Sequence, residues 1–358
     1  MARKVWRMTS EHGRHGGHER HEAAHEPGHR SGPAQGPPRP GHEPGHEPGQ
    51  GPGPAQGHDA TGPAHGHTHG HGDDVDWAAM AAVLEREGRI QLPALARAAE
   101  WLRGLPADGG GQGVRRVLDV GSGPGVAACL LAETFPTAEV VAVDGSGLLL
   151  ERARRRAAEA GLDQSRFQVL ETELPEGFDA LGRADLIWTS KAVHHLGDQQ
   201  DAVNRLAKAL RDGGLLAVAE GGLPLRYLPR DIGIGRPGLL TRIEAATDDL
   251  FTGMRAGLPH TVATTEDWPA MLRRAGLTPA GTRTFLTDLP APLDDEVREQ
   301  LHSHLGRARE RLAGALDASD LRTVDILLDD DSPESVRRRP DAFYLSAATV
   351  HTAVRPVR

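Results

Sequence analysis

Cysteine and long apolar runs are scarce in this chain of 358 residues, and their scarcity excludes several classes of protein. Cys129 is the one cysteine, so no disulfide can form within the chain, which suits a reducing compartment. No stretch approaches the ~20 apolar residues of a membrane span, and the opening MARKVWRMTS lacks the apolar core of a secretion signal. We therefore expect a cytoplasmic protein without a membrane partner.

Lysine is scarce as well, and basic residues as a whole are outnumbered. Of the 41 Lys and Arg residues three are Lys, and together they oppose 50 Asp and Glu, which gives a net charge of -9. Residues 1–72 hold seven bases and seven acids, so the excess negative charge lies on the rest of the chain. A folded part with that charge argues against nucleic acid as a partner.

Residues 1–72 have the composition of a disordered, His-rich tail. They are mostly His, Gly, Pro, Glu and Arg, and cannot bury enough apolar surface to offset the loss of chain entropy. The tail contains 13 of the 19 histidines, and its end alternates four of them with other residues: His65, His67, His69 and His71. Such imidazoles can bind a divalent metal weakly. The repeat GHEPGHEPG favours a low-complexity extension that has no selected role over a metal-handling function.

The most informative segment is the glycine-rich turn LDVGSGPG, residues 118–125. One apolar run ends at this turn, and a second apolar run, residues 140–143, ends at Asp144. This order predicts a strand, a tight turn, a helix and a second strand, which is a nucleotide-binding α/β unit. A dinucleotide site would need a further glycine where this chain has Val126, so the fit to NAD is poor.

The spacing D-x-G-x-G-x-G, from Asp119 through Gly121 and Gly123 to Gly125, resembles motif I of class I S-adenosylmethionine (SAM)-dependent methyltransferases. The resemblance implies SAM as the cofactor, with Asp119 near its cationic groups and Asp144 accepting hydrogen bonds from its ribose hydroxyls. It also implies further residues around the cofactor: Ser122, Gly145, Glu173 and Ser190. Glu173 would take the place of an acid that accepts from the adenine amino group. Glu171 is the alternative for that role, and two solvated loop glutamates are the other reading.

Strand and helix patterns alternate after this turn. Strands are expected at 116–120, 139–144, 167–170, 184–190, 215–219, 282–286 and 342–350. The order resembles that of class I methyltransferases, which implies an α/β fold with a Rossmann-like, doubly wound, seven-stranded sheet whose last strand is antiparallel. A Rossmann dehydrogenase would normally lack that closing strand.

The pattern divides the chain into three expected parts: the tail 1–72, a helical N-terminal cap 73–113, and a methyltransferase domain 114–358. Helical spacing before the sheet predicts two helices in the cap, the second starting near Pro93. Two insertions are expected within the domain, at 221–267 and 290–340. The first leaves the carboxyl edge of the sheet, where ligands bind, so it is expected to shape a substrate pocket. The second is helical, and three roles stay open: covering the pocket, forming a homodimer, or padding the fold.

The segment TSKAVHHL, residues 189–196, resembles motif IV of small-molecule methyltransferases. His194 and His195 are candidate general bases, because a hydroxyl must lose a proton to become a good nucleophile; local packing is the alternative. Three charged residues are candidates for substrate binding: Glu220, Arg226 and Arg230. The two arginines would meet a carboxylated substrate, although most surface charges are only solvated.

We therefore predict an enzyme that transfers a methyl group from SAM to O, N or C of a small molecule by direct displacement. The sulfonium is already electrophilic, so the protein supplies positioning and desolvation, and a base where the nucleophile is a hydroxyl. Two alternatives stay open. One is a non-catalytic SAM-binding or metal-responsive scaffold, and the other is a methyltransferase that acts on a macromolecule.

Overall fold

A computed structural model describes residues 77–105 and 113–357 of the chain. Its seven-stranded sheet has the order β3-β2-β1-β4-β5-β7-β6. The strands are β1 (Arg116–Val120), β2 (Glu139–Asp144), β3 (Phe167–Glu171), β4 (Ala184–Ser190), β5 (Leu210–Arg226), β6 (Thr278–Leu289) and β7 (Tyr344–Val354). The predicted bounds of β1, β2 and β4 agree with the structure, and β3 is one residue longer than predicted. Strands β5 and β6 extend beyond both of their predicted ends, whereas β7 begins and ends later than predicted.

The strand directions agree with the predicted fold. Strands β1 to β5 pair in parallel, and β7 is antiparallel to both of its neighbours, β5 and β6. In the central register, Val120 lies opposite Val143 of β2 and Thr189 of β4. The carboxyl ends of three strands therefore meet at one edge of the sheet. The α/β fold class with an antiparallel last strand is confirmed.

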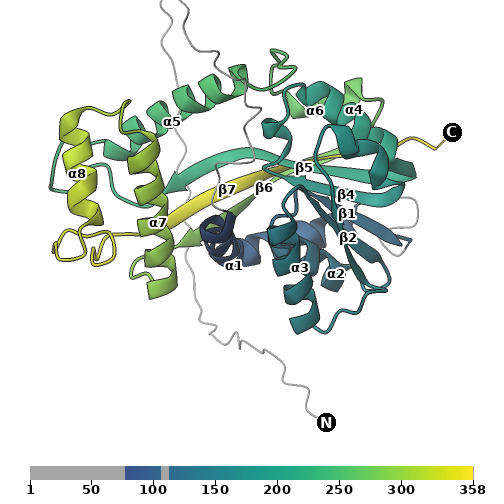
Figure 1. Ribbon diagram of the computed structural model, residues 1–358, viewed down its shortest axis with the longest axis horizontal. Coiled ribbons are helices and arrows are strands. Elements are labelled where there is room, and N and C mark those ends of the chain that lie inside the picture. The colour runs from purple at the N-terminus through teal and green to yellow at the C-terminus, as the bar shows by residue number, and fades with distance from the viewer. Residues whose placement is uncertain (1–76, 106–112, 358) are drawn as a thin grey trace, which may run out of the picture. The chain divides into compact units, whose positions relative to one another are not determined.

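The central strands β1, β2 and β4 are buried on both faces, as their near-continuous apolar runs require. Val117 of β1 belongs to the core beneath α1 (Trp77–Arg103), α2 (Val126–Thr134) and α3 (Gly147–Glu159). Its neighbour Leu118 faces the opposite core, which α4 (Gln199–Ala209) and α6 (Trp268–Arg274) cover. Figure 1 shows these two helical layers on either side of the sheet.

The N-terminal cap differs from the prediction of two helices. Within the described residues it is one continuous helix, α1, with Pro93 inside it. Packing outweighs the local cost of the proline, because α1 buries Ala94, Ala98 and Leu102 in the core. At Gly88 the helix lies so close to α2 that a Cβ there would be 2.7 Å from Val126 Cγ2. The cap is thereby held directly beside the start of α2.

The two segments expected as insertions form one structural unit. Strand β5 runs to Arg226, so its last residues extend the sheet beyond the predicted end at 219. The remainder contains α5 (Leu239–Ala256), α7 (Asp295–Arg311) and α8 (Ala318–Leu328), which lie at one end of the sheet in Figure 1. A third apolar core joins both segments, with Tyr227 and Ile243 from the first and Leu301 and Leu327 from the second. We call this unit the insertion subdomain.

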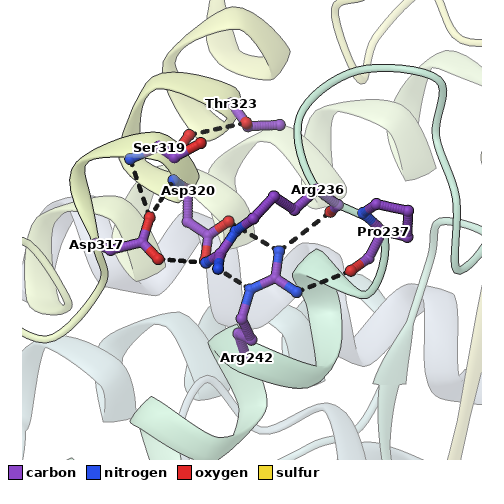
Figure 2. Close-up of polar contacts among 7 residues, drawn as sticks. All are labelled: Arg236, Pro237, Arg242, Asp317, Ser319, Asp320 and Thr323. Atoms are coloured by element: carbon purple, nitrogen blue, oxygen red, sulfur yellow. Dashed lines mark hydrogen bonds and ion pairs between the residues drawn. The ribbon is translucent and has the colours of Figure 1, made fainter.

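A buried carboxylate ties the two halves of the insertion subdomain together. Asp320 of α8 is 1% exposed and accepts from Arg242 Nε at 2.6 Å and Nη2 at 2.8 Å. Arg236 Nη2 donates to the same carboxylate at 2.9 Å and also pairs with Asp317 (Figure 2). Hydrogen bonds from Arg242 hold the pKa of Asp320 below its ordinary value. Two guanidinium groups from the first segment therefore converge on one acid from the second.

None of the helices in the described residues is both long and apolar enough to cross a membrane.

Removing the carboxylate of Asp320 is expected to destabilise the protein. Asp320→Ala leaves two guanidinium groups without their buried acceptor and should lower the free energy of unfolding by about 2 kcal/mol. The matched control is Asp325→Ala in the same helix, which removes an exposed pair with Arg309 and should cost less than about 1 kcal/mol. Urea titration of both variants measures the difference, and equal losses would contradict the role given to Asp320.

Candidate functional site

The turn after β1 adopts backbone angles that glycine favours. Gly121, Gly123 and Gly125 have φ of 76°, 53° and 78°. A Cβ at Gly121 would be 2.5 Å from the Cβ of Ala192, and one at Gly125 would be 2.9 Å from the Cα of Ala153. At Gly123 no atom lies within 4 Å of such a Cβ. Two glycines therefore allow close packing of the chain, while the third faces open space at the sheet edge.

Asp144, at the end of β2, holds this turn in place. Its Oδ2 accepts from the backbone N–H of Gly123 at 2.8 Å, and its Oδ1 accepts from that of Ser146 at 2.9 Å. Burial raises the pKa of Asp144, and these N–H groups oppose the rise. The carboxylate thus joins the turn after β1 to the start of α3 and stays at the edge where Gly123 is open.

Asp119 has a different environment, although it belongs to the same motif. It is 2% exposed, and its Oδ2 has no hydrogen-bond partner among the described residues. Burial raises its pKa to about 7, and the nearby Asp144 adds to the rise while a backbone N–H of Ala128 opposes it. Asp119 lies beneath the turn, inside the protein, rather than on its open side.

The other predicted cofactor residues lie around the same edge. Glu173 lies against Gly145, where a Cβ would be 2.5 Å from its Oε1, and Glu171 lies in the same way against Gly147. Both glutamates are exposed. Ser122 is buried, and its Oγ has no partner among the described residues. Ser190 ends β4 and is partly buried. The structure therefore brings the carboxyl ends of β1, β2 and β4 together with both candidate glutamates.

The turn after β4 is held by two charged residues on opposite sides. Glu220 of β5 is 5% exposed and accepts from the N–H groups of Ala192 and Val193 at 3.0 and 3.1 Å. Its other oxygen lies 2.8 Å from Nδ1 of His194. Arg255 of α5 donates to the carbonyl oxygens of His194 and Leu196. Arg255 lies in the first insertion, and the sequence analysis found no motif that includes it.

The candidate bases and the candidate substrate residues lie outside the lining of the cavity described next. His194 stacks near His195, with ring centroids 4.2 Å apart, and His195 is exposed. Arg226 pairs with Glu244 at 2.6 Å, and Arg230 is exposed. None of these four residues lines the cavity described next, nor does Glu220.

A cavity of about 380 Å³ lies between α1, the extended parts of β5, β6 and β7, and α7. We call it the sheet-edge cavity. Ser190 and Trp188 of β4 form part of its wall, so it adjoins the edge that carries the cofactor candidates. Its polar lining includes six residues that the sequence analysis did not single out: Glu87, Gln91, Lys191, Gln300, His304 and Tyr344. Four of them come from α1 and α7, whose helical patterns carry no motif for a site.

Polar contacts organise one side of this cavity. Lys191 Nζ donates to Glu87 Oε1 at 2.8 Å, and Gln91 Nε2 donates to the same oxygen at 3.0 Å. Desolvation would raise the pKa of Glu87, but the ammonium of Lys191, together with His304 and Arg307, outweighs it and leaves that pKa below its ordinary value. Burial lowers the pKa of His304 to about 4, and Arg307 adds to the lowering. At neutral pH the cavity therefore holds one closed ion pair and a neutral imidazole.

The metal candidates of the tail, His65, His67, His69 and His71, lie outside the described residues. Within residues 77–105 and 113–357, no group of three or more His, Cys, Asp or Glu side chains could hold a metal ion.

Comparison with known proteins finds methyltransferases that match the part of the chain containing this edge. A family model described as "Methyltransferase domain" matches residues 118–216. A trans-aconitate 2-methyltransferase from Variovorax paradoxus is 39% identical over 105 residues, which are 29% of this chain and 37% of that protein. A protein of the same name from Methylobacterium nodulans is 30% identical over 166 residues, 46% of this chain and 57% of that protein. The chain thus spans between 37% and 57% of the length of these relatives.

Among solved structures, the YcgJ protein from Bacillus subtilis covers 74% of this chain and 99% of its own, at 21% identity and a TM-score of 0.40. The predicted resemblance to class I methyltransferases is confirmed by the matched domain and the methyltransferase relatives.

The buried carboxyl of Asp119 predicts a pH-dependent stability. Its folded-state pKa of about 7 lies above its ordinary value of 3.8, so between these values the folded protein binds more protons than the unfolded chain. The stabilisation is complete below about pH 4 and is lost as pH rises to about 7. Asp119→Asn removes this dependence, so the free energy of unfolding of the variant relative to the parent should rise by about 3 kcal/mol between pH 5 and pH 8.

Urea titration at both pH values checks this expectation, with Asp179→Asn as the control because Asp179 is exposed. Parallel pH dependences in the parent and Asp119→Asn proteins would show that burial does not control this carboxyl.

Proposed function

We propose that this chain, whose residues 118–216 form a class I methyltransferase domain, transfers a methyl group from SAM to a small molecule held in the sheet-edge cavity. The observation that carries the proposal is the position of Ser190. It ends β4 beside the glycine-rich turn and also lines the cavity, so a cofactor at the turn and an acceptor in the cavity would meet there. The cavity volume lies in the range of small-molecule sites, which favours a small acceptor over a macromolecule.

The residues at the edge fit SAM. Gly123 leaves room for a ligand against the main chain, and Ser122 supplies a buried hydroxyl without a partner among the described residues. Asp144 is the acceptor proposed for the ribose hydroxyls, and Glu173 or Glu171 for the adenine amino group. Bound SAM would supply a sulfonium methyl that is open to direct attack by O, N or C.

The protein's own part in the reaction is positioning. Glu220 holds the turn after β4 through its backbone N–H groups, and Arg255 holds it through its carbonyl oxygens. Ser190, at the end of β4, and Lys191, which follows it, both line the cavity. His194 contacts Glu220 and does not line the cavity, which suits a positioning role better than that of a base for an acceptor held there. His304 lines the cavity as a neutral imidazole and can accept a hydrogen bond that orients a hydroxyl.

A non-catalytic scaffold would need no cavity beside the cofactor edge. The sheet-edge cavity therefore favours the enzyme over that alternative.

Calorimetric titration of SAM and S-adenosylhomocysteine into the full chain tests the cofactor site. We expect micromolar dissociation constants in the parent and at least a tenfold weakening in Asp144→Ala, because the ribose acceptor and the anchor of the turn are both lost.

Gly123→Ala and Gly161→Ala form a matched pair for the same titration. Both glycines have positive φ, 53° and 76°, and neither has an atom within 4 Å of an added Cβ. The backbone strain should therefore be similar, about 1 kcal/mol in each. SAM affinity should fall at least tenfold in Gly123→Ala alone. Absence of SAM binding by the parent, or equal affinities in the two variants, would exclude the proposed cofactor site.

A further inference from the structure

We propose that the sheet-edge cavity selects an uncharged, hydroxyl-bearing acceptor with an apolar body and discriminates against carboxylates. The inference rests on the proposed function and names the substrate class of that same site. It also separates this chain from the two curated relatives named for trans-aconitate, which is a polycarboxylate.

One wall of the cavity is apolar. It is formed by Ala94, Leu95 and Ala98 of α1, with Phe285 of β6 and Val350 of β7. The small alanine side chains leave space between the helix and the sheet, and the aromatic and branched residues provide an apolar surface. Such a wall stabilises an apolar group by removing it from water, and it offers a charged group neither a hydrogen bond nor an opposite charge.

The fixed charges of the cavity cancel. Among the described residues that line it, Lys191 is the one Lys or Arg and Glu87 is the one Asp or Glu. Their side chains meet at 2.8 Å, so each charge already has an opposite partner. A carboxylate that entered the cavity would lose hydration without gaining an unpaired cation, and a polycarboxylate would lose more.

Two residues that line the cavity each carry a buried polar atom that lacks a partner among the described residues. Gln300 of α7 is 2% exposed, and its Oε1 has no hydrogen-bond partner among the described residues. Trp188 is 3% exposed, and its Nε1 has none either. Oε1 needs a donor and Nε1 needs an acceptor. A hydroxyl group can serve as either, whereas an ionised carboxylate has no hydrogen to donate to Gln300.

A pair of probes of equal shape tests the selection. Para-hydroxybenzamide and para-hydroxybenzoate differ by one charge, and each is titrated calorimetrically into the full chain saturated with S-adenosylhomocysteine. We expect the amide to bind at least tenfold more tightly than the benzoate, and trans-aconitate to show no heat of binding. Because saturation with S-adenosylhomocysteine is measured first, failure of the cofactor site is distinguished from failure of the selection.

Three variants locate the cause. Gln300→Leu should weaken the amide about tenfold, whereas Gln199→Leu should leave it unchanged. Gln199 is the matched control because it is a buried glutamine whose Oε1 also lacks a partner among the described residues, but it lies outside the cavity. Glu87→Gln leaves Lys191 unpaired and should tighten the benzoate about tenfold with little effect on the amide.

The outcomes separate clearly. Tighter binding of the amide, together with a gain for the benzoate in Glu87→Gln, supports the proposal. Binding of the benzoate or trans-aconitate as tight as that of the amide overturns it, and so does a protein that binds S-adenosylhomocysteine but not the amide. Thermal melting of each variant, with its affinity for S-adenosylhomocysteine, shows that the fold and the cofactor site are intact.

Discussion

The carboxylate of Asp144 is the contact on which the cofactor edge depends. A turn with three glycines at positive φ has little conformational preference of its own, because glycine is so permissive. Asp144 fixes that turn through the N–H of Gly123 and fixes the start of α3 through the N–H of Ser146. It can do so because the parallel register puts the ends of β1 and β2 side by side. A single acid thereby shapes the turn whose open side faces a ligand.

Glu220 has the corresponding part in the turn after β4. It accepts two backbone N–H groups and contacts His194, while Arg255 binds the carbonyl oxygens of the same turn. The acids that lie within or just after the strands therefore differ in role. Asp119 is sealed beneath the turn, and Asp144 and Glu220 organise backbone. Glu171 and Glu173 stay exposed, free to meet a cofactor.

The insertion subdomain contributes both to the stability of the fold and to the lining of the sheet-edge cavity. Its core and the carboxylate of Asp320 hold α7 and α8 to the segment after β5. Helix α7 in turn supplies Gln300 and His304 to the sheet-edge cavity. In the proposed function, the segments added to the minimal fold line the acceptor side, whereas the minimal fold carries the cofactor side.

The sequence by itself determined the fold class, the order of the strands along the chain, and the glycines and acids that the structure places at the carboxyl edge of the sheet. These features depend on local signals: apolar runs, glycines that must turn, and an acid at the end of a strand. Only the tertiary structure decided the acceptor side and the continuity of α1 through Pro93. Gln300, Tyr344 and Glu87 are far apart in the chain and belong to ordinary helical or strand patterns. They become one surface because β5, β6 and β7 extend beyond the other strands and because α7 packs back on α1, and such long-range packing leaves no mark on local spacing.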